Sequence, residues 1–522
     1  MIGGPRYADL LALFDEWRAF ERPALVHGAP DYTAETLARK HKHLENFKQR
    51  LLDIDPADWS VEQQVDRHLV RAELNGFDFN CRVLKPWERD PAFYQSIWTA
   101  QSDTPAHEGT TNHALIELWA YTFPLSPADE TKLAHELQVI PPLLAQACEN
   151  LVGKARDLWM AGLGTLRQQA ADLSALQSRL AGGGETIQQA VRAAHRATDD
   201  FIAWLEKQAP AKTEPSGIGK KHYTWGLRNV HCVPLSWDDE VDLLKRELAR
   251  AHTALRLEEH RNRALPELKV ASSSAEYDQR ANEAVTKYVA FLKDRQIMPM
   301  QSYTDSAIRA QIGSFVPESQ RHFFAMATHR EPMTLFTHFY HWWDLAQMRA
   351  QPHASPIRRG PLLFNIWDSR AEGMATGMEE MMLHAGLFDD NPRAREIIWI
   401  MLAARAARGL GSLYAHANEF TMKQAADFHV KWTPRGWMRP DLDLLGFEQQ
   451  LYLRQPGYGT SYITGKFLLE QLLTARADQL GSRFTLSGFF SEVNAAGLIP
   501  VSLLHWQLTG DETAIKALSA AA

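Results

Sequence analysis

The sequence predicts a mainly α-helical fold with little or no β-structure. Apolar residues recur at three- and four-residue spacing through almost every long segment of the 522-residue chain, and this spacing gives a helix one apolar face. Runs of alternating apolar and polar residues, which would predict strands, are scarce. Hydrophobic residues make up 45% of the chain, enough to bury a large core. Together these observations favour one large helical body.

The first helices are predicted over 7–21 and 33–53, where the apolar residues follow the helical spacing. A third helix should begin after Ser60, a candidate N-cap with the acidic Glu62 in its first turn. The stretch 84–111 is irregular and rich in aromatic residues. Long irregular stretches are often lids or pocket walls, so we expect this one to border a binding site.

Three long helices are predicted between 127 and 208, interrupted at Pro141–Pro142 and at a run of glycines. The segment 207–221 is the best candidate for a linker, because Pro, Gly and Lys dominate it and no apolar period crosses it. It predicts an N-terminal helical lobe over 1–210 and a C-terminal helical lobe over 222–522, which could also form one continuous domain.

Two short stretches of the C-terminal half suggest extended structure. They are 265–273 and 295–303. A charged helix with one solvated face is predicted just before them, over 238–263. Strands are therefore expected to be few and short.

The composition argues against several classes of function. The net charge is −7 and the pI is near 6.3, and no basic run suggests nucleic acid. No apolar stretch reaches the ~18 residues that a membrane-spanning helix needs, and the N-terminus lacks the features of a secretory signal. Three widely spaced cysteines fit a reducing cytoplasm. We therefore expect a cytoplasmic protein that acts on neither nucleic acid nor a membrane.

The segment HFYHWWD holds the clearest candidate for a chemical site. Its residues His338, His341 and Asp344 recur every third position, and each residue turns a helix by about 100°, which predicts adjoining positions on one helical face. Glu372 follows on the next predicted helix. Imidazole and carboxylate ligands suit zinc, iron or manganese, so these four residues form a candidate metal site. Glu379 would lie about 10 Å further along the same helix face, behind the ligands.

An alternative stays open for this segment. It is strongly aromatic, so its histidines could be packed core residues that bond to backbone carbonyls. Trp342 and Trp343 are interpreted as core or pocket wall in either case. The sequence leaves a metal-binding or polar site and a packed core equally open.

The segment RQPGYGTSYITGK, residues 454–466, is a second candidate. Its Pro-Gly pair and following glycine predict a tight turn before a helix that starts near Ser461, and the amides at such a helix start point into an adjoining cleft. Tyr458 and Tyr462 could share one face, and a tyrosine hydroxyl can donate to a developing oxyanion. Alternatively, the glycines only begin a helix and the tyrosines cover the core.

These segments resemble the bacterial family called domain of unknown function 885. The C-terminal stretch 454–504 is similar to the family pattern R-x-x-PGQALSY-x-x-G, followed by G-x-x-F-x-x-x-x-FH and G-x-x-P-L. The segment AEGMATGMEEMMLHAGLFDD, residues 371–390, resembles the family's EGWALYAE and GLYDD motifs. The segment LLDIDPADWSVEQQVDRHLV, residues 51–70, resembles its N-terminal helices.

That family is similar to the all-helical zinc peptidases of the thimet oligopeptidase and carboxypeptidase Taq type, in which two helical halves flank a deep cleft. The resemblance implies a zinc-dependent hydrolase of amide or ester bonds that acts on a small-molecule or short peptide-like substrate. It matches Glu372 with the third metal ligand, Glu379 with a later glutamate and Tyr462 with the oxyanion donor. It matches His338 with the first histidine ligand, because Gln347 then falls on the family's trailing glutamine.

The chain departs from the family where the chemistry is carried. Phe339 stands at the position of the catalytic glutamate, and Asp344 at that of the second ligand. Leu345 replaces the last histidine of H-E-x-x-P-G-H-H, and Phe490 replaces the histidine of the FH motif. His341 has no counterpart but is well spaced to act as a ligand. Because phenylalanine cannot accept a proton from the attacking water, the resemblance does not imply ordinary peptidase activity.

Three functions therefore remain open. In the first, a diverged hydrolase keeps the metal and uses another carboxylate as its base, either Asp344, Asp368 or Glu379. In the second, the chain is a pseudoenzyme that binds a ligand or partner. In the third, the two histidines and Glu372 form the iron centre of an oxygenase or lyase.

The cleft that the resemblance implies should have walls from several segments. We expect these walls to include 89–100, 329–331, Arg358–Arg359 and Tyr458. The two arginines could bind a substrate carboxylate, or they could lie in a solvated loop. The candidate catalytic residues are Tyr462, Tyr458, Glu379 and Arg454.

Overall fold

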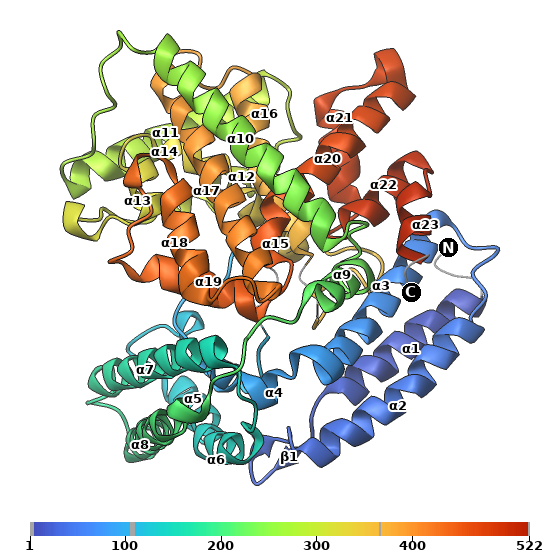
Figure 1. Ribbon diagram of the computed structural model, residues 1–522, viewed down its shortest axis with the longest axis vertical. Coiled ribbons are helices and arrows are strands. Elements are labelled where there is room, and N and C mark those ends of the chain that lie inside the picture. The colour runs from blue at the N-terminus through green and yellow to red at the C-terminus, as the bar shows by residue number, and fades with distance from the viewer. Residues whose placement is uncertain (1–4, 105–109, 365–366, 520–522) are drawn as a thin grey trace.

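The computed structural model describes residues 5–104, 110–364 and 367–519, and it confirms the mainly α-helical fold (Figure 1). The N-terminal helices are α1 (Pro5–Glu21), α2 (Ala34–Asp53), α3 (Val61–Phe79), α4 (Pro86–Arg89), α5 (Pro127–Leu137), α6 (Ile140–Asn150), α7 (Arg156–Arg179) and α8 (Glu185–Gln208). The C-terminal helices are α9 (Lys220–Asn229), α10 (Trp237–Arg261), α11 (Ser274–Asp294), α12 (Thr304–Arg309), α13 (Phe323–Thr328), α14 (Pro332–Phe336), α15 (Tyr340–Ala350), α16 (Asp368–His384), α17 (Pro392–His416), α18 (Met422–Trp432), α19 (Asp443–Arg454), α20 (Tyr458–Leu480), α21 (Leu486–Ala495), α22 (Val501–Thr509) and α23 (Thr513–Ser519). The short helices are the π-helical turn η1 (Asn80–Leu84) and the 3₁₀ turns η2 (Pro91–Tyr94), η3 (Leu118–Ala120), η4 (Ala209–Ala211), η5 (Glu318–Gln320), η6 (Pro434–Gly436) and η7 (Gly481–Arg483).

The strands of the described residues are short, as expected, but lie elsewhere than predicted. They are β1 (Leu25–Val26) with β2 (Ala29–Pro30), an antiparallel pair, and β3 (Ile97–Trp98) with β4 (Ile116–Glu117), a parallel pair. The stretches 265–273 and 295–303 are irregular and pair with no strand. Each contains a proline, Pro266 or Pro299, which has no amide hydrogen to contribute to a ladder.

Most predicted helices form where the apolar spacing places them. Ser60 caps α3 as expected, because its hydroxyl accepts the amide hydrogen of Gln63 while the Gln63 side chain accepts that of Ser60. Between 127 and 208 the structure has four helices instead of three. The additional break, at 151–155, includes Gly153, whose amide donates to the carbonyl of Glu88 at 2.9 Å.

The buried side chains form two main hydrophobic cores. The larger core combines side chains of α1, α2 and α3 with side chains of the C-terminal helices. The smaller core lies among α5–α8, which gather at one end of the molecule (Figure 1). The first three helices therefore share a core with the C-terminal helices. Within the described ranges, no helix combines the length and the apolar character needed to cross a membrane.

Helices α16 and α20 cross with their backbones in direct contact. A Cβ added at Gly373 of α16 would lie 2.5 Å from the Cα of Gly465 of α20, and one added at Gly465 would lie 2.0 Å from the carbonyl oxygen of Ser369. The start of α20 is also close to α17, because a Cβ at Gly409 would lie 2.9 Å from the carbonyl oxygen of Gly459. Glycine at these positions therefore determines how closely the three helices approach.

A buried carboxyl group joins α10 to α9 and α20. Glu240 accepts hydrogen bonds from the hydroxyls of Tyr223, Thr460 and Thr464 at 2.8, 3.1 and 2.8 Å. Burial raises the pKa of Glu240 to about 7, although these hydrogen bonds act in the opposite direction. The group therefore couples the packing of α20 to pH.

We expect Gly465→Ala to destabilise the protein by at least about 3 kcal/mol, because the new methyl group would collide with a backbone oxygen that cannot rotate away. Thermal unfolding followed by circular dichroism measures the effect. Gly164→Ala is the matched control, since this exposed glycine of α7 has no atom within 4 Å of an added Cβ. The control should leave stability unchanged or raise it by up to about 1 kcal/mol. Equal stability of Gly465→Ala and wild type would contradict the close crossing.

We also expect Glu240→Gln to change how stability depends on pH. The folded state holds the proton of Glu240 more tightly than an unfolded carboxyl of pKa 4.5 does. This tighter binding contributes up to about 3 kcal/mol to the free energy of unfolding. The contribution is complete below about pH 4.5 and is lost as the pH rises to about 7. Because glutamine does not ionise, the variant should gain stability relative to wild type as the pH rises. Unfolding midpoints from about pH 5 to about pH 8 test this, with exposed Glu35→Gln as the control. A stability difference that stays constant with pH would count against it.

Candidate functional site

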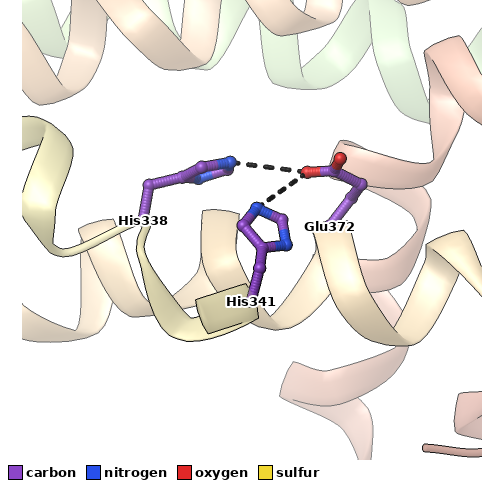
Figure 2. Close-up of side chains that lie close together, drawn as sticks. All are labelled: His338, His341 and Glu372. Carbon is purple, nitrogen blue, oxygen red and sulfur yellow. Dashed lines mark ion pairs between the residues drawn. The ribbon is translucent and has the colours of Figure 1, made fainter. Parts of the chain in front are cut away.

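Three buried side chains converge in the larger core. The Nε2 atoms of His338 and His341 each lie 3.4 Å from the same oxygen, Oε2 of Glu372 (Figure 2). The two histidines are 8% and 2% exposed and Glu372 is 1% exposed. Their ligand atoms all lie within 4.8 Å of one another. We call these three residues the histidine–glutamate cluster.

The histidines do not share one continuous helix, which corrects the prediction for HFYHWWD. Helix α14 ends at Phe336, residues 337–339 form a turn, and α15 begins at Tyr340. His338 therefore reaches Glu372 from a turn, whereas His341 reaches it from the first turn of α15 (Figure 2). The turn brings both imidazoles toward one carboxylate oxygen.

Glu372 is held on its other side by a tyrosine. The Tyr458 hydroxyl, from the first residue of α20, donates to Oε1 of Glu372 at 2.7 Å. This leaves Oε2 facing the two imidazoles. The pKa of the Glu372 carboxyl is well below its usual range, because His341, His338 and the Tyr458 hydroxyl outweigh the opposing effect of burial.

His338 is oriented by a second carboxylate. Its Nδ1 lies 2.9 Å from Oε1 of Glu379, and both oxygens of Glu379 accept hydrogen bonds from Arg405 at 2.7 Å. Nη2 of Arg405 also lies 3.1 Å from this Nδ1. A hydrogen on Nδ1 that is directed at Glu379 would leave the Nε2 lone pair free to face Glu372. Burial and Arg405 lower the pKa of His338, but Glu372 and Glu379 outweigh them and raise it.

Asp344, a predicted ligand, lies outside the cluster. Its two oxygens accept hydrogen bonds from Nη1 and Nη2 of Arg370, each at 3.2 Å. Both side chains are buried, and such a pair neutralises its own charge. Asp344 and Arg370 therefore form a separate ion pair beside the cluster.

The other candidate residues occupy different places. Tyr462 lies against His338, with nearly parallel rings whose centroids are 6.1 Å apart, and its hydroxyl is 3.4 Å from that of Tyr458. Asp368 begins α16 and accepts a hydrogen bond from Gln455 at 2.6 Å. Arg454 donates to Asp90 at 2.6 Å and to the carbonyl of Thr110 at 2.7 Å, so its described contacts join α19 to the N-terminal part of the chain.

The expected cleft walls are largely structural. Of the stretch 89–100, Phe93, Tyr94 and Ile97 are buried in the smaller core. Arg358 is buried and its Nε donates to Asp66 at 2.5 Å, so its guanidinium is already engaged within the chain. Exposed Arg359 bonds only backbone carbonyls among the described residues.

One cavity adjoins the second predicted segment. It has a volume of about 240 Å³ and is lined by residues that include 110–113, Gln455 and Pro456. The irregular stretch 84–111 thus contributes Leu84, Thr110 and Thr111 to this cavity, whereas its residues 105–109 lie outside the described part of the chain. Gln455 connects the cavity wall to Asp368 at the start of α16.

Asp103 is a carboxyl group that sequence reasoning missed. Burial raises its pKa, and the charges of His341, Glu372 and His338 are the next largest influences on it. Asp103 therefore lies within electrostatic range of the whole cluster. Only its place in the irregular stretch that was expected to border the site hinted at this.

The cluster has the donor set of a transition-metal site. Within the described residues, both nitrogens of His341 and Oε2 of Glu372 are buried and have no hydrogen-bond partner. Leaving such atoms buried and unpaired costs free energy. The neighbouring buried carboxylates, Glu379 and Asp344, are each matched by an arginine, whereas Glu372 faces only imidazoles and a hydroxyl. A divalent cation would satisfy Nε2 of His341 and Oε2 of Glu372, which lie 3.4 Å apart, so the residues fit a metal.

Comparison with solved structures shows the same fold in two bacterial proteins. One is described as a putative lipoprotein of unknown function from Shewanella oneidensis, with a TM-score of 0.71 and 13% identity over 96% of this chain and 99% of that one. The other is described as a putative lipoprotein from Colwellia psychrerythraea, with a TM-score of 0.64 and 13% identity over 99% of both chains. No curated protein matches the sequence.

The sequence pattern of the family described as "Bacterial protein of unknown function (DUF885)" matches residues 24–354. This range covers more than half of the chain. It includes His338 and His341 and ends before Glu372, although the resemblance had been clearest in the C-terminal segments. The chain is therefore a member of the bacterial DUF885 family.

Proposed function

We propose that the chain is a metal-dependent hydrolase of amide or ester bonds in a small substrate, with His338, His341 and Glu372 as the metal ligands. The observation that supports this most directly is the convergence of two imidazole nitrogens on one buried carboxylate oxygen at 3.4 Å. A divalent metal held there, with zinc as the first candidate and iron or manganese as alternatives, would act as a Lewis acid on a substrate carbonyl.

The chain's own groups have separate tasks in this proposal. Tyr458 holds Glu372 through Oε1, and Glu379 holds His338 through Nδ1, so both ligands keep their orientation. The Tyr462 hydroxyl is the candidate donor to the oxyanion that forms on the substrate. The Arg408 guanidinium, whose Cζ lies 4.0 Å from the Tyr462 ring centroid, favours a polarised phenol.

Asp103 is the proposed general base in place of the glutamate that Phe339 replaces. The other carboxylates considered are engaged, because Glu379 is held by Arg405, Asp344 by Arg370 and Asp368 by Gln455. Burial raises the pKa of Asp103, which brings it closer to the pH at which a base accepts a proton efficiently. Its carboxylate would take the proton of the attacking water and pass it to the leaving group.

The cavity of about 240 Å³ is the proposed space for the substrate. Its lining includes Glu21 and Arg454, but these ionic groups are paired within the chain, Glu21 with His113 at 3.1 Å and Arg454 with Asp90 at 2.6 Å. The cavity therefore presents little unbalanced charge. This favours an uncharged substrate portion in the cavity.

Metal binding distinguishes the proposed ligands from their neighbours. We expect metal-free wild type to bind about one equivalent of zinc and Glu372→Gln to bind it at least about 100-fold more weakly, because an amide is a poor substitute for the carboxylate ligand. Isothermal titration calorimetry and elemental analysis measure this. Asp344→Asn should retain binding, since that residue pairs with Arg370.

Glu380→Gln is the matched control for this experiment. Glu380 is another buried carboxylate of α16, but it pairs with Arg250 and Lys466 instead of the histidines. Its variant should bind zinc as wild type does. Stoichiometric zinc in folded Glu372→Gln, or none in wild type with any of the three metals, would refute the ligand assignment.

Hydrolysis is tested separately from metal binding. Asp103→Asn and Tyr462→Phe should each lower kcat by about 100-fold or more while each still binds about one equivalent of zinc, because neither side chain is a proposed ligand. A panel of p-nitrophenyl esters and aminoacyl p-nitroanilides provides the substrates.

Full activity of Asp103→Asn would remove it as the base. A zinc-loaded wild type that hydrolyses no member of the panel would favour a ligand-binding pseudoenzyme. Preferential binding of iron would instead favour oxygenase or lyase chemistry.

A further inference from the structure

A second polar pocket lies apart from the histidine–glutamate cluster. It has a volume of about 480 Å³ and is open to solvent; its charged lining residues are Arg263, Arg330, Arg393, Arg435, Glu259 and Glu267. We call it the arginine pocket. Its walls come from the end of α10, the loop after it, the turn before α14, the start of α17 and the turn η6. Every lining residue belongs to the described part of the chain.

The carboxylates of the arginine pocket balance only some of its arginines. Arg435 pairs with Glu259 at 2.8 Å, and Arg393 pairs with Glu267 at 3.3 Å. Glu396, which lies behind them, bonds both of these arginines.

The other two arginines of the pocket have no carboxylate partner among the described residues. Arg263 donates to the carbonyl of His260 at 2.7 Å, and Arg330 donates to that of Met326 at 2.8 Å. In addition, Nε of Arg393 is buried without a hydrogen-bond partner in the described structure. The pocket therefore holds guanidinium hydrogens without acceptors and positive charge that no carboxylate of the described residues neutralises. This occurs in a chain whose overall net charge is −7.

Arg330 is held in place at the centre of this arrangement. Its Cζ lies 4.9 Å from the ring centroid of the buried Trp437, which fixes the guanidinium plane at little cost in side-chain entropy. Burial lowers the pKa of Arg330, and the positive charges of Arg321 and Arg435 lower it further. Arg321 itself bonds only backbone carbonyls among the described residues. The positive charges of Arg321, Arg330 and Arg435 are thus close together, and the carboxylates nearby do not neutralise all of them.

The backbone at Arg435 is strained in a way that presents its side chain to the pocket. Its φ is +59° and its ψ is +15°, in the left-handed region that residues with a Cβ rarely adopt. Gly436 follows at φ +64°. Strain of this kind persists where the surrounding structure enforces it and is common at ligand sites.

We propose that the arginine pocket binds a small multivalent oxyanion that carries phosphate or carboxylate groups. Guanidinium groups donate paired hydrogen bonds to both kinds of group, and a volume of about 480 Å³ exceeds what a single inorganic phosphate would fill. Such a ligand would satisfy the free hydrogens of Arg330 and Arg263. The inference does not depend on the proposed hydrolase activity.

Calorimetric titration of the full chain with pyrophosphate and with citrate, at low ionic strength, tests the proposal. We expect saturable binding of at least one ligand, at least about 10-fold weaker in Arg330→Met and weakened by added sodium chloride. Methionine keeps the apolar cover over Trp437, so the variant should fold. Arg330→Lys should bind with intermediate affinity. Arg483→Ala, which removes an exposed arginine of η7, should bind as wild type does.

The two ligands separate the two chemistries, because binding of pyrophosphate alone assigns a phosphate-bearing ligand and binding of citrate alone a polycarboxylate. Both ligands chelate metals, so the titration is repeated with metal-free Glu372→Gln, in which the affinity should be unchanged. Failure of wild type to bind either ligand up to about 5 mM, or equal affinity of Arg330→Met and wild type, would overturn the proposal. Loss of binding in Glu372→Gln would place the ligand at the cluster instead.

Discussion

The contact between Gly373 of α16 and Gly465 of α20 is the constraint on which the arrangement of the site depends. Glu372 is the neighbour of Gly373, and Tyr462 lies one turn before Gly465, so the close crossing sets the carboxylate beside the tyrosines of α20. A second close approach, of Gly409 on α17 to the start of α20, fixes α20 from the other side. A side chain at any of these glycines would push the helices apart. Because Tyr458 and Glu372 lie on different helices, the hydrogen bond between them would then be lost.

Two of the buried carboxylates next to the cluster are neutralised by arginines, whereas Glu372 is not, among the residues that the structure describes. Glu379 with Arg405 and Asp344 with Arg370 each cancel within the core, which is how a protein tolerates buried ionic groups. Glu372 has no such cation. In the absence of a metal, a proton on His338 would balance the carboxylate, in agreement with the raised pKa of that histidine. A metal would have to displace this proton, so its affinity should fall as the pH is lowered.

The two polar sites differ in the chemistry that they offer. The histidine–glutamate cluster is almost fully buried, combines one carboxylate with two imidazoles and lies among closely packed helices. The arginine pocket is open, carries positive charge and is built mainly from helix ends and connections. The fold shared with the two bacterial proteins supports neither function by itself, because one fold carries many activities. Each proposed function depends on the side chains that face one another in its own site.

The sequence by itself determined the helical class, most helix positions, the Ser60 cap and the residue types of the cluster, because apolar spacing, capping and ligand chemistry are local properties. It placed Asp344 among the ligands and two prolines in extended runs, and it did not reveal Asp103 or the arginine pocket. Those features depend on which side chains meet across distant segments, such as Asp344 with Arg370 or Arg330 with Trp437. Only tertiary packing decides such meetings, since burial and partner charge, not spacing along the chain, determine whether a polar group binds a ligand or is neutralised within the fold.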